Sequence, residues 1–191
     1  MGSEMCIRDS EETLCSRVDR LQTGNGMSEG VGVGPLVSEA AVAKVEKQVE
    51  DARKKGAGVP IGGHRLTEGS YSAGHFFAPT VLTDISDDMT IYREETFGPV
   101  APVITYDEPD EVIELANDTN YGLAAYVYTR DIAVAMRAFE GLRFGIIGVN
   151  DVNPTSASVP FGGMGDSGLG REGGHEGINE YLETKTGGFA I

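Results

Sequence analysis

The sequence is organised around Glu94-Glu95-Thr96-Phe97-Gly98-Pro99, in the middle of a chain of 191 residues. Two adjacent carboxylates and an aromatic ring here precede a Gly-Pro turn, and the apolar run Val100 to Tyr106 follows directly. This order indicates a loop that leads into a strand, where α/β proteins commonly place functional side chains. Neighbouring residues of an extended chain point to opposite faces, so Glu94 and Glu95 are not expected to form an acid–base pair. The residues alone leave open whether the carboxylates serve a site or a solvated turn.

Regular alternation of apolar and amphipathic segments follows this loop. Strands are expected at 100–106, 123–129 and 144–149, with helices at 108–117 and 130–141 between them. The first helix is expected to bury Val112, Ile113, Leu115 and Ala116, and the second Ile132, Ala135, Met136 and Phe139. Short connections between such elements predict parallel strands with right-handed crossovers, covered on both faces. A last strand from 181–185 and 189–191 would be free to pair elsewhere, including with another subunit.

The chain before the loop is a longer lead-in. Ser38 is expected to cap an amphipathic helix whose apolar residues fall at helical spacing, namely Ala41, Val42, Val45, Val49 and Ala52. The segment 76–82 is expected to be a strand interrupted at Pro79, and hence an edge or bulged strand. Residues 1–10 show no periodicity and are interpreted as a non-native leader outside the fold. The predicted class is α/β, a parallel-rich open sheet with flanking helices.

Composition limits the possible functions. The net charge of −15 argues against nucleic acid as a partner, because phosphates would be repelled over most of the surface. No apolar run approaches the ~18 residues of a membrane span, and no segment resembles a signal peptide. Two cysteines, Cys6 and Cys15, form no disulfide framework and fit a reducing compartment. The cytoplasm is therefore the expected location.

Two other kinds of site are disfavoured by local pattern. The glycine-rich run matches G-x-G-x-x-G twice, at 163–168 and 168–173, but no apolar strand precedes it and Gly173-Gly174 would break a following helix. A structural glycine turn near a site is the better interpretation. The three histidines have no metal-ligand spacing. Cys15 has no nearby histidine and is interpreted as a buried structural residue rather than a nucleophile.

Three motifs together carry a family resemblance. They are Glu94-Glu95-Thr96-Phe97-Gly98-Pro99-Val100, Ala116-Asn117-Asp118-Thr119-Asn120-Tyr121-Gly122-Leu123-Ala124-Ala125, and Pro160-Phe161-Gly162-Gly163-Met164 with Ser167-Gly168-Leu169-Gly170-Arg171-Glu172. In order and spacing they resemble the aldehyde dehydrogenase superfamily, from about Thr13 to the C-terminus. The chain looks like the C-terminal part of such an enzyme. The resemblance implies a partial catalytic domain over 11–176 and an oligomerisation segment over 177–191.

The resemblance also implies roles for individual residues. Glu95 matches the glutamate that holds the nicotinamide ribose hydroxyls, Phe97 the aromatic residue near the nicotinamide, and Leu123 a further neighbour of that ring. The cofactor is therefore expected to be NAD or NADP. On the substrate side, Phe161 matches the lining of the aldehyde tunnel, and Asn150 to Ser158 the loop that shapes substrate choice. Arg171 and Glu183 match a pair that braces the oligomer interface.

The nucleophilic cysteine of the family stands in a G-Q-x-C setting, which neither cysteine of this chain matches. That cysteine, the general-base glutamate, the oxyanion asparagine and the nucleotide-binding domain are expected upstream, so the chain is interpreted as an inactive fragment. Residues 170–178 and 180–185 look most like the succinate-semialdehyde dehydrogenase branch, although Thr155 stands where that branch usually has a carboxylate-binding serine, beside the unusual Asn153-Pro154. The expected partners are a small acidic aldehyde and further copies of the chain. A generic aliphatic or aromatic aldehyde dehydrogenase, and a fragment acting only in subunit assembly, remain the alternatives.

Overall fold

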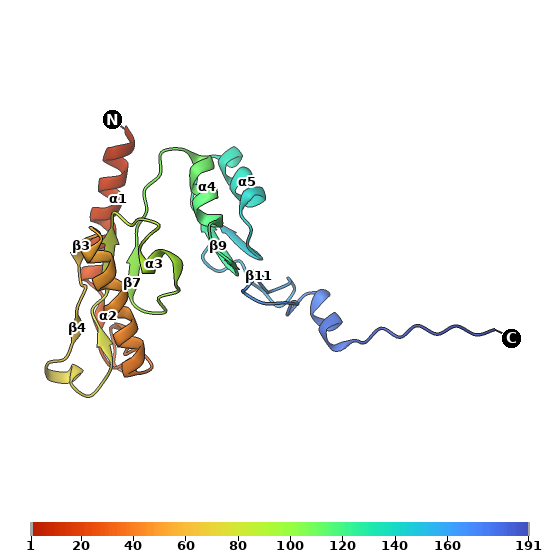
Figure 1. Cartoon of the computed structure of the whole chain (residues 1–191), viewed down its shortest axis with the longest axis horizontal. Coiled ribbons are helices and arrows are strands. Elements are labelled where there is room, and N and C mark those ends of the chain that lie inside the picture. The colour runs from red at the N-terminus through yellow and green to blue at the C-terminus, as the bar shows by residue number, and fades with distance from the viewer. Residues whose placement is uncertain (1, 191) are drawn as a thin grey trace. The chain divides into compact units, whose positions relative to one another are not determined.

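The structure, a computed structural model, describes residues 2–190, with side chains from residue 7 onward. The chain forms two compact units, Met1–Thr105 and Tyr106–Ile191, within the range expected to be one domain. Both units mix helices with short strands, which agrees with the predicted α/β class (Figure 1). No helix among residues 2–190 is long and apolar enough to cross a membrane.

The first unit contains most of the buried apolar core. Its helices are α1 (Gly2–Asp19), α2 (Glu39–Lys54), α3 (Thr90–Arg93) and the 3-10 turn η1 (Gly69–Tyr71). Its strands are β1 (Gln22–Thr23), β2 (Val31–Val33), β3 (Gly58–Ile61), β4 (Arg65–Leu66), β5 (Phe76–Phe77), β6 (Thr80–Thr83) and β7 (Val100–Pro102). Residues 2–10, expected to stand outside the fold, continue one helix with residues 11–19. Whether they are a non-native leader stays a prediction.

Helix α2 confirms the prediction made from its periodicity. Ser38 is the N-cap, and its hydroxyl accepts a hydrogen bond from the Ala41 N–H at 3.2 Å. One face of the helix is buried, and it packs with residues of β6 and of the segment before β7 in the core formed by Val42, Val45, Val49, Ala52, Ala57, Phe77, Leu82, Ile85, Met89 and Ile91. This core fixes α2 against the chain that leads into residues 94–99.

The sheet in this unit has the order β3-β6-β7. Strand β6 pairs antiparallel with β3 and parallel with β7, so it is the central strand. The break at Pro79 is confirmed, because β5 ends at Phe77 and β6 begins at Thr80. Of the two predicted alternatives, the edge strand is wrong, because β6 is central; its pairing with β3 does show a register shift, between Gly58 and Ile61 of β3. The proline lies between two short strands and so costs β6 no ladder hydrogen bond.

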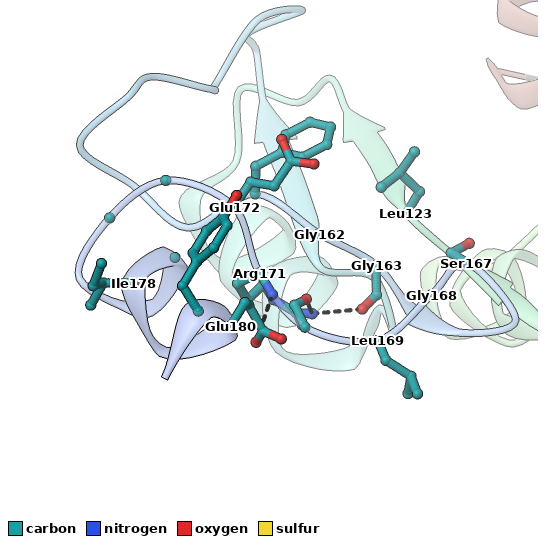
Figure 2. Close-up of a pocket in the computed structure, with 16 residues that line it drawn as sticks. Leu123, Gly162, Gly163, Ser167, Gly168, Leu169, Arg171, Glu172, Ile178 and Glu180 are labelled. Carbon is teal, nitrogen blue, oxygen red and sulfur yellow. Dashed lines mark hydrogen bonds between the residues drawn. The ribbon is translucent and has the colours of Figure 1, made fainter. Parts of the chain in front are cut away.

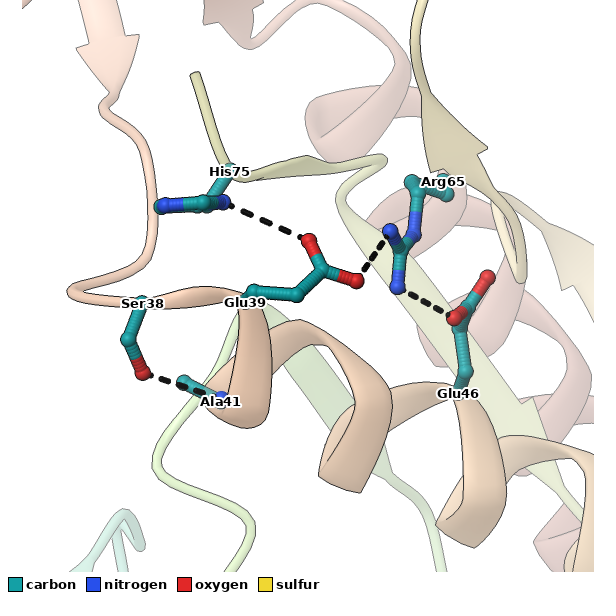
Figure 3. A network of polar contacts seen from close by, with 6 residues as sticks. All are labelled: Ser38, Glu39, Ala41, Glu46, Arg65 and His75. Carbon is teal, nitrogen blue, oxygen red and sulfur yellow. Dashed lines mark hydrogen bonds and ion pairs between the residues drawn. The ribbon is translucent and has the colours of Figure 1, made fainter.

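A polar network joins the N-terminal half of α2 to its neighbours (Figure 3). The Arg65 guanidinium donates to the Glu39 carboxylate at 2.6 Å and to the Glu46 carboxylate at 2.7 Å, while His75 Nδ1 lies 3.5 Å from Glu39. The hydrogen bond from Arg65 holds the pKa of Glu39 below its ordinary value. These contacts join β4 and the residue before β5 to α2.

The second unit contains the helices α4 (Pro109–Asn117) and α5 (Ile132–Gly141), the 3-10 turn η2 (Glu176–Tyr181), and the strands β8 (Tyr121–Gly122), β9 (Ala124–Val127), β10 (Ile146–Val149) and β11 (Met164–Gly165). Strands β9 and β10 pair in parallel, from Ala124 with Ile146 to Val127 with Val149, as the alternation predicted. Strand β7 ends at Pro102, earlier than expected, and its parallel partner is β6. Residues 182–190 form no strand and run as an extended chain (Figure 1).

The prediction for the buried face of α5 is largely wrong. Ala135 and Ala138 are buried, whereas Ile132 is 76% exposed and Met136 and Phe139 are about half exposed. In α4 the four residues expected inside are half-buried. Ala135 and Ala138 therefore pack α5 into the unit, while the large apolar side chains next to Ala135 on the helix surface stay largely exposed.

Candidate functional site

Residues 94–99 form the loop between α3 and β7, and core contacts fix both of its ends. Met89 and Ile91 are buried ahead of it. At the far end the Pro99 carbonyl accepts a hydrogen bond from the Thr80 N–H at 2.9 Å. A Cβ added at Gly98 would lie 2.6 Å from Cγ2 of Val45, which is in the core, so the backbone approaches α2 as closely as only glycine allows.

Side chains of α2 hold the main chain of the two glutamates. Gln48 Nε2 donates to the Glu94 carbonyl at 3.4 Å, and Lys44 Nζ donates to the Glu95 carbonyl. The Glu95 residue is exposed, and its carboxylate forms no hydrogen bond or ion pair with the described residues. Its main chain is therefore fixed while its carboxylate stays available to a ligand.

Phe97 has an uncommon backbone conformation. Its φ of 50° lies in the left-handed region, which few residues other than glycine adopt. The residue is also 80% exposed, so no packing of the ring offsets this conformation. Strained backbone of this kind gathers at functional sites, where the surrounding structure enforces it.

The helix α3 that precedes this loop is anchored by Asp51 of α2. The Asp51 carboxylate accepts a hydrogen bond from the Thr90 N–H at 2.8 Å and forms an ion pair with Lys55 at 3.1 Å. The Thr90 N–H, and then the Lys55 ammonium, lower the pKa of Asp51 to about 2. Asp51 therefore caps α3, whose own N-cap residue, Met89, offers no side-chain cap.

The second unit holds an open pocket of about 810 Å³ around its glycine-rich turn (Figure 2). Leu123 and Phe161, predicted to lie on the cofactor and substrate sides, both line it. The Arg171 guanidinium donates to the carbonyls of Gly163 at 2.8 Å and Gly170 at 2.7 Å, as Figure 2 shows. Arg171 thus braces the turn from within.

The glycine-rich run itself forms a turn and not a phosphate-binding loop. The short strand β11 lies inside the run, pairs antiparallel with β8, and is followed by no α-helix up to residue 190. The Ser167 hydroxyl accepts a hydrogen bond from the Gly122 N–H at 2.9 Å. Glu183 is exposed and forms no ion pair with Arg171 in the described chain, so a shared role at a subunit interface stays a prediction.

The expected substrate loop begins at Asn150, which the structure identifies as its anchor. Asn150 has a φ of 54°, and its side chain accepts from the Thr129 N–H at 3.0 Å and donates to the Thr129 carbonyl at 2.8 Å. Further along, the Thr155 hydroxyl donates to Asn153 Oδ1 at 3.0 Å. Asn153 and Thr155 therefore contact each other, but neither lines the pocket of Leu123 and Phe161.

The predicted site residues divide between the two units. Glu95 and Phe97 lie together on one loop of the first unit, and Leu123 and Phe161 around one pocket of the second. Sequence reasoning missed the roles of Lys44, Gln48 and Asp51, and it placed Asn150 in the substrate loop without its anchoring contacts. Cys15 is half-buried on α1, less than expected, and the side chain of Cys6 lies outside the described residues.

Comparison with known proteins decides the family. The sequence profile described as "Aldehyde dehydrogenase family" matches residues 4–187. The chain belongs to the aldehyde dehydrogenase family. It is 46% identical over 174 residues to a succinate-semialdehyde dehydrogenase [NADP(+)] of Escherichia coli, covering 91% of this chain and 35% of that protein. It is 47% identical over 174 residues to a 3-sulfolactaldehyde dehydrogenase of Pseudomonas putida, with the same two coverages.

A solved structure agrees with this assignment. The betaine aldehyde dehydrogenase of Staphylococcus aureus in complex with NAD+ superposes with a TM-score of 0.88 at 40% identity, over 94% of this chain and 36% of that one. The chain therefore spans about a third of the length of these relatives. The resemblance to aldehyde dehydrogenases, inferred from three motifs, is confirmed, as is the similarity to succinate-semialdehyde dehydrogenases.

Proposed function

We propose that this chain supplies the nicotinamide-ribose loop and the aldehyde-side pocket of an NAD(P)-dependent aldehyde dehydrogenase. One observation carries the proposal. An exposed aromatic ring, held in a left-handed backbone conformation, stands two residues from a carboxylate that no described residue engages. Such an arrangement is unfavourable for folding alone, and a ligand with hydroxyl groups and a flat ring would use both side chains.

The side chains fit a nicotinamide nucleotide. The Glu95 carboxylate has two acceptor oxygens and can accept from both hydroxyls of the ribose. The Phe97 ring offers an apolar face to the nicotinamide. Leu123, which lines the pocket of the second unit, is proposed separately as a cofactor contact. When bound, the cofactor supplies the hydride acceptor for aldehyde oxidation. The cofactor is NAD or NADP, since one similar protein is named for NADP+ and one similar structure contains NAD+.

A small acidic aldehyde is the proposed substrate. Two similar proteins are named for aldehydes that also carry an acid group, succinate semialdehyde and 3-sulfolactaldehyde. In this chain the Thr155 hydroxyl donates to Asn153 Oδ1, and we propose that the Nδ2 group of Asn153, oriented in this way, donates to the anionic group. Phe161 is proposed to line the approach of the aldehyde. Phe161 is partly exposed in the pocket wall, so its ring is available to contact an apolar carbon chain.

We expect no dehydrogenase turnover from the 191-residue chain alone. A thioester mechanism needs an activated thiolate, and Cys15 is half-buried on α1 in a Thr-Leu-Cys-Ser setting that does not match the G-Q-x-C of the family's nucleophile. The C-terminal residues 183–190 are exposed and belong to no strand, and we propose that they pair with a further copy of the chain.

The test is a hybrid enzyme with a matched pair of variants. The C-terminal third of the E. coli relative is replaced by this chain, and NADPH formation from succinate semialdehyde is followed. Glu95→Gln removes the charge that receives the ribose hydroxyls, so kcat/KM for NADP+ should fall about tenfold to a hundredfold. Glu94→Gln should leave it within about twofold. Equal activity of the Glu95→Gln and unsubstituted hybrids would contradict the proposed role.

A further inference from the structure

Helix α2 carries a polar stripe beside its buried apolar face. The stripe consists of Lys44, Gln48, Asp51 and Lys55, the last being the C-cap residue of the helix. Spacings of four, three and four residues place these side chains on one face of a helix.

The polar stripe binds the chain ahead of β7 at successive points, in antiparallel order. Lys55 donates to the Asp88 carbonyl, and Asp51 accepts from the Thr90 N–H at 2.8 Å. Gln48 then donates to the Glu94 carbonyl at 3.4 Å, and Lys44 to the Glu95 carbonyl. All four contacts are made to main-chain atoms. The stripe therefore fixes the path of the backbone and leaves the side chains of the loop free.

Apolar packing does not reach the middle of the loop. Buried residues anchor α3 through Met89 and Ile91, and the close contact of Gly98 with Val45 anchors the other end. Between these anchors, Glu95 and Phe97 are exposed. Besides the Glu94 N–H, which donates to the Thr90 carbonyl, the two carbonyl contacts from Gln48 and Lys44 restrain the backbone that carries both side chains.

Gln48 is an energetically unfavourable residue at a buried position, so its presence is not explained by folding stability alone. Its residue is 1% exposed, and its Oε1 has no hydrogen-bond partner among the described residues. A buried acceptor without a partner is unfavourable, and an apolar side chain of the same length would avoid that cost. What the glutamine adds is the Nε2 donor that reaches Glu94.

We propose that Gln48 and Asp51 are positioning residues, Gln48 through its contact with the Glu94 carbonyl and Asp51 through its contact with Thr90 at the start of α3. Together they hold the chain before β7 so that the Glu95 carboxylate and the Phe97 ring face a nicotinamide ribose. This inference rests on the function proposed above for that loop. It predicts that the loop loosens when the stripe is cut, even where the rest of the unit remains as stable as before.

The test uses the full ¹⁵N-labelled chain with Gln48→Met, which keeps the length of the side chain and removes its polar atoms. The free energy of unfolding should be unchanged or higher, because the unpartnered acceptor is gone. The NMR order parameters of the Thr96, Phe97 and Gly98 amides should fall from about 0.85 to below about 0.6. The Glu94 amide, bonded to the Thr90 carbonyl, should exchange at least about tenfold faster.

Asp51→Ala provides a second variant, with Glu50→Ala as its matched control. Asp51→Ala should speed exchange of the Thr90 amide by at least about tenfold. Among the described residues, Glu50 pairs with Arg53 and Lys54 on the surface, so its removal should leave α3 and the loop unaffected. The inference is overturned if Gln48→Met leaves the order parameters unchanged, or if loop amides loosen only as much as amides in the core of the unit.

Titration with nicotinamide mononucleotide separates this inference from the function on which it rests. Gln48→Met should weaken binding at least about fivefold if the loop holds the ribose. If the unsubstituted chain shows no response to the nucleotide at the loop, the proposed function fails, and the order parameters decide the positioning role independently. Equal affinity of the two proteins would overturn the positioning of Glu95.

Discussion

Phe97 provides a test of whether the backbone of the candidate loop is strained. Its φ of 50° is unfavourable for any residue with a Cβ, but not for glycine. Phe97→Gly and Phe97→Ala both remove the ring, which is 80% exposed and loses little burial in either case. The two variants therefore differ mainly in the cost of the left-handed backbone.

The size of that difference follows from two opposing terms. The left-handed conformation costs an L-residue roughly 1–2 kcal/mol. Against this, glycine is less favourable than alanine by about 0.4–1 kcal/mol, because an unfolded chain with glycine has more conformations to lose on folding. We therefore expect Phe97→Gly to be more stable than Phe97→Ala by about 0.5–1 kcal/mol.

Urea unfolding, followed through amide resonances of the first unit, measures this difference. Ala43→Gly is the control, because here glycine should lower stability relative to alanine. Ala43 is solvent-exposed in the middle of helix α2, where glycine should cost about 1 kcal/mol. If Phe97→Ala is as stable as Phe97→Gly while the control behaves as expected, residue 97 is not strained and the reasoning from its backbone is wrong.

Three further substitutions test the surroundings of the site. Gly98→Ala places a methyl group against buried Val45, and a loss of about 1–3 kcal/mol is expected in the same urea assay. The pKa of Asp51 is lowered to about 2 from 3.8, so the contribution of its carboxylate to folding stability is complete above about pH 4 and is lost as the pH falls through about 2. In an acid titration, the stability of Asp51→Asn should therefore decline less steeply between these pH values than that of the unsubstituted chain. Asn150→Ala removes both hydrogen bonds to Thr129 and should cost about 1–3 kcal/mol, with the change in amide exchange confined to the second unit.

Sequence patterns predicted the elements better than their environments. The cap at Ser38 and the apolar spacing of α2 are local signals, and both are confirmed. The same reasoning failed for α5, because spacing identifies an apolar face without identifying what covers it. Ile132 and Phe139 share such a face, yet the small residues Ala135 and Ala138 are the ones that pack inward.

The candidate site divides in a similar way. The motif around Glu95 and Phe97 could be recognised, since its residue types and order are distinctive. Its support could not, because Gln48 and Lys44 lie 46 and 51 residues before the carbonyls that they contact, and no local pattern records such pairs. The left-handed conformation of Phe97 is likewise imposed by the fixed ends of the loop and not by its own preference.

Titration of the ¹⁵N-labelled chain with nicotinamide mononucleotide tests the central claim most directly. We expect saturable shifts of the Glu95 to Gly98 amides, with a Kd in roughly the millimolar range, since only part of a binding site is present. Glu95→Ala should abolish these shifts, and Glu94→Ala should preserve them. Shifts that gather elsewhere on the chain, or that persist in Glu95→Ala, would contradict the assignment of this loop to the nicotinamide ribose.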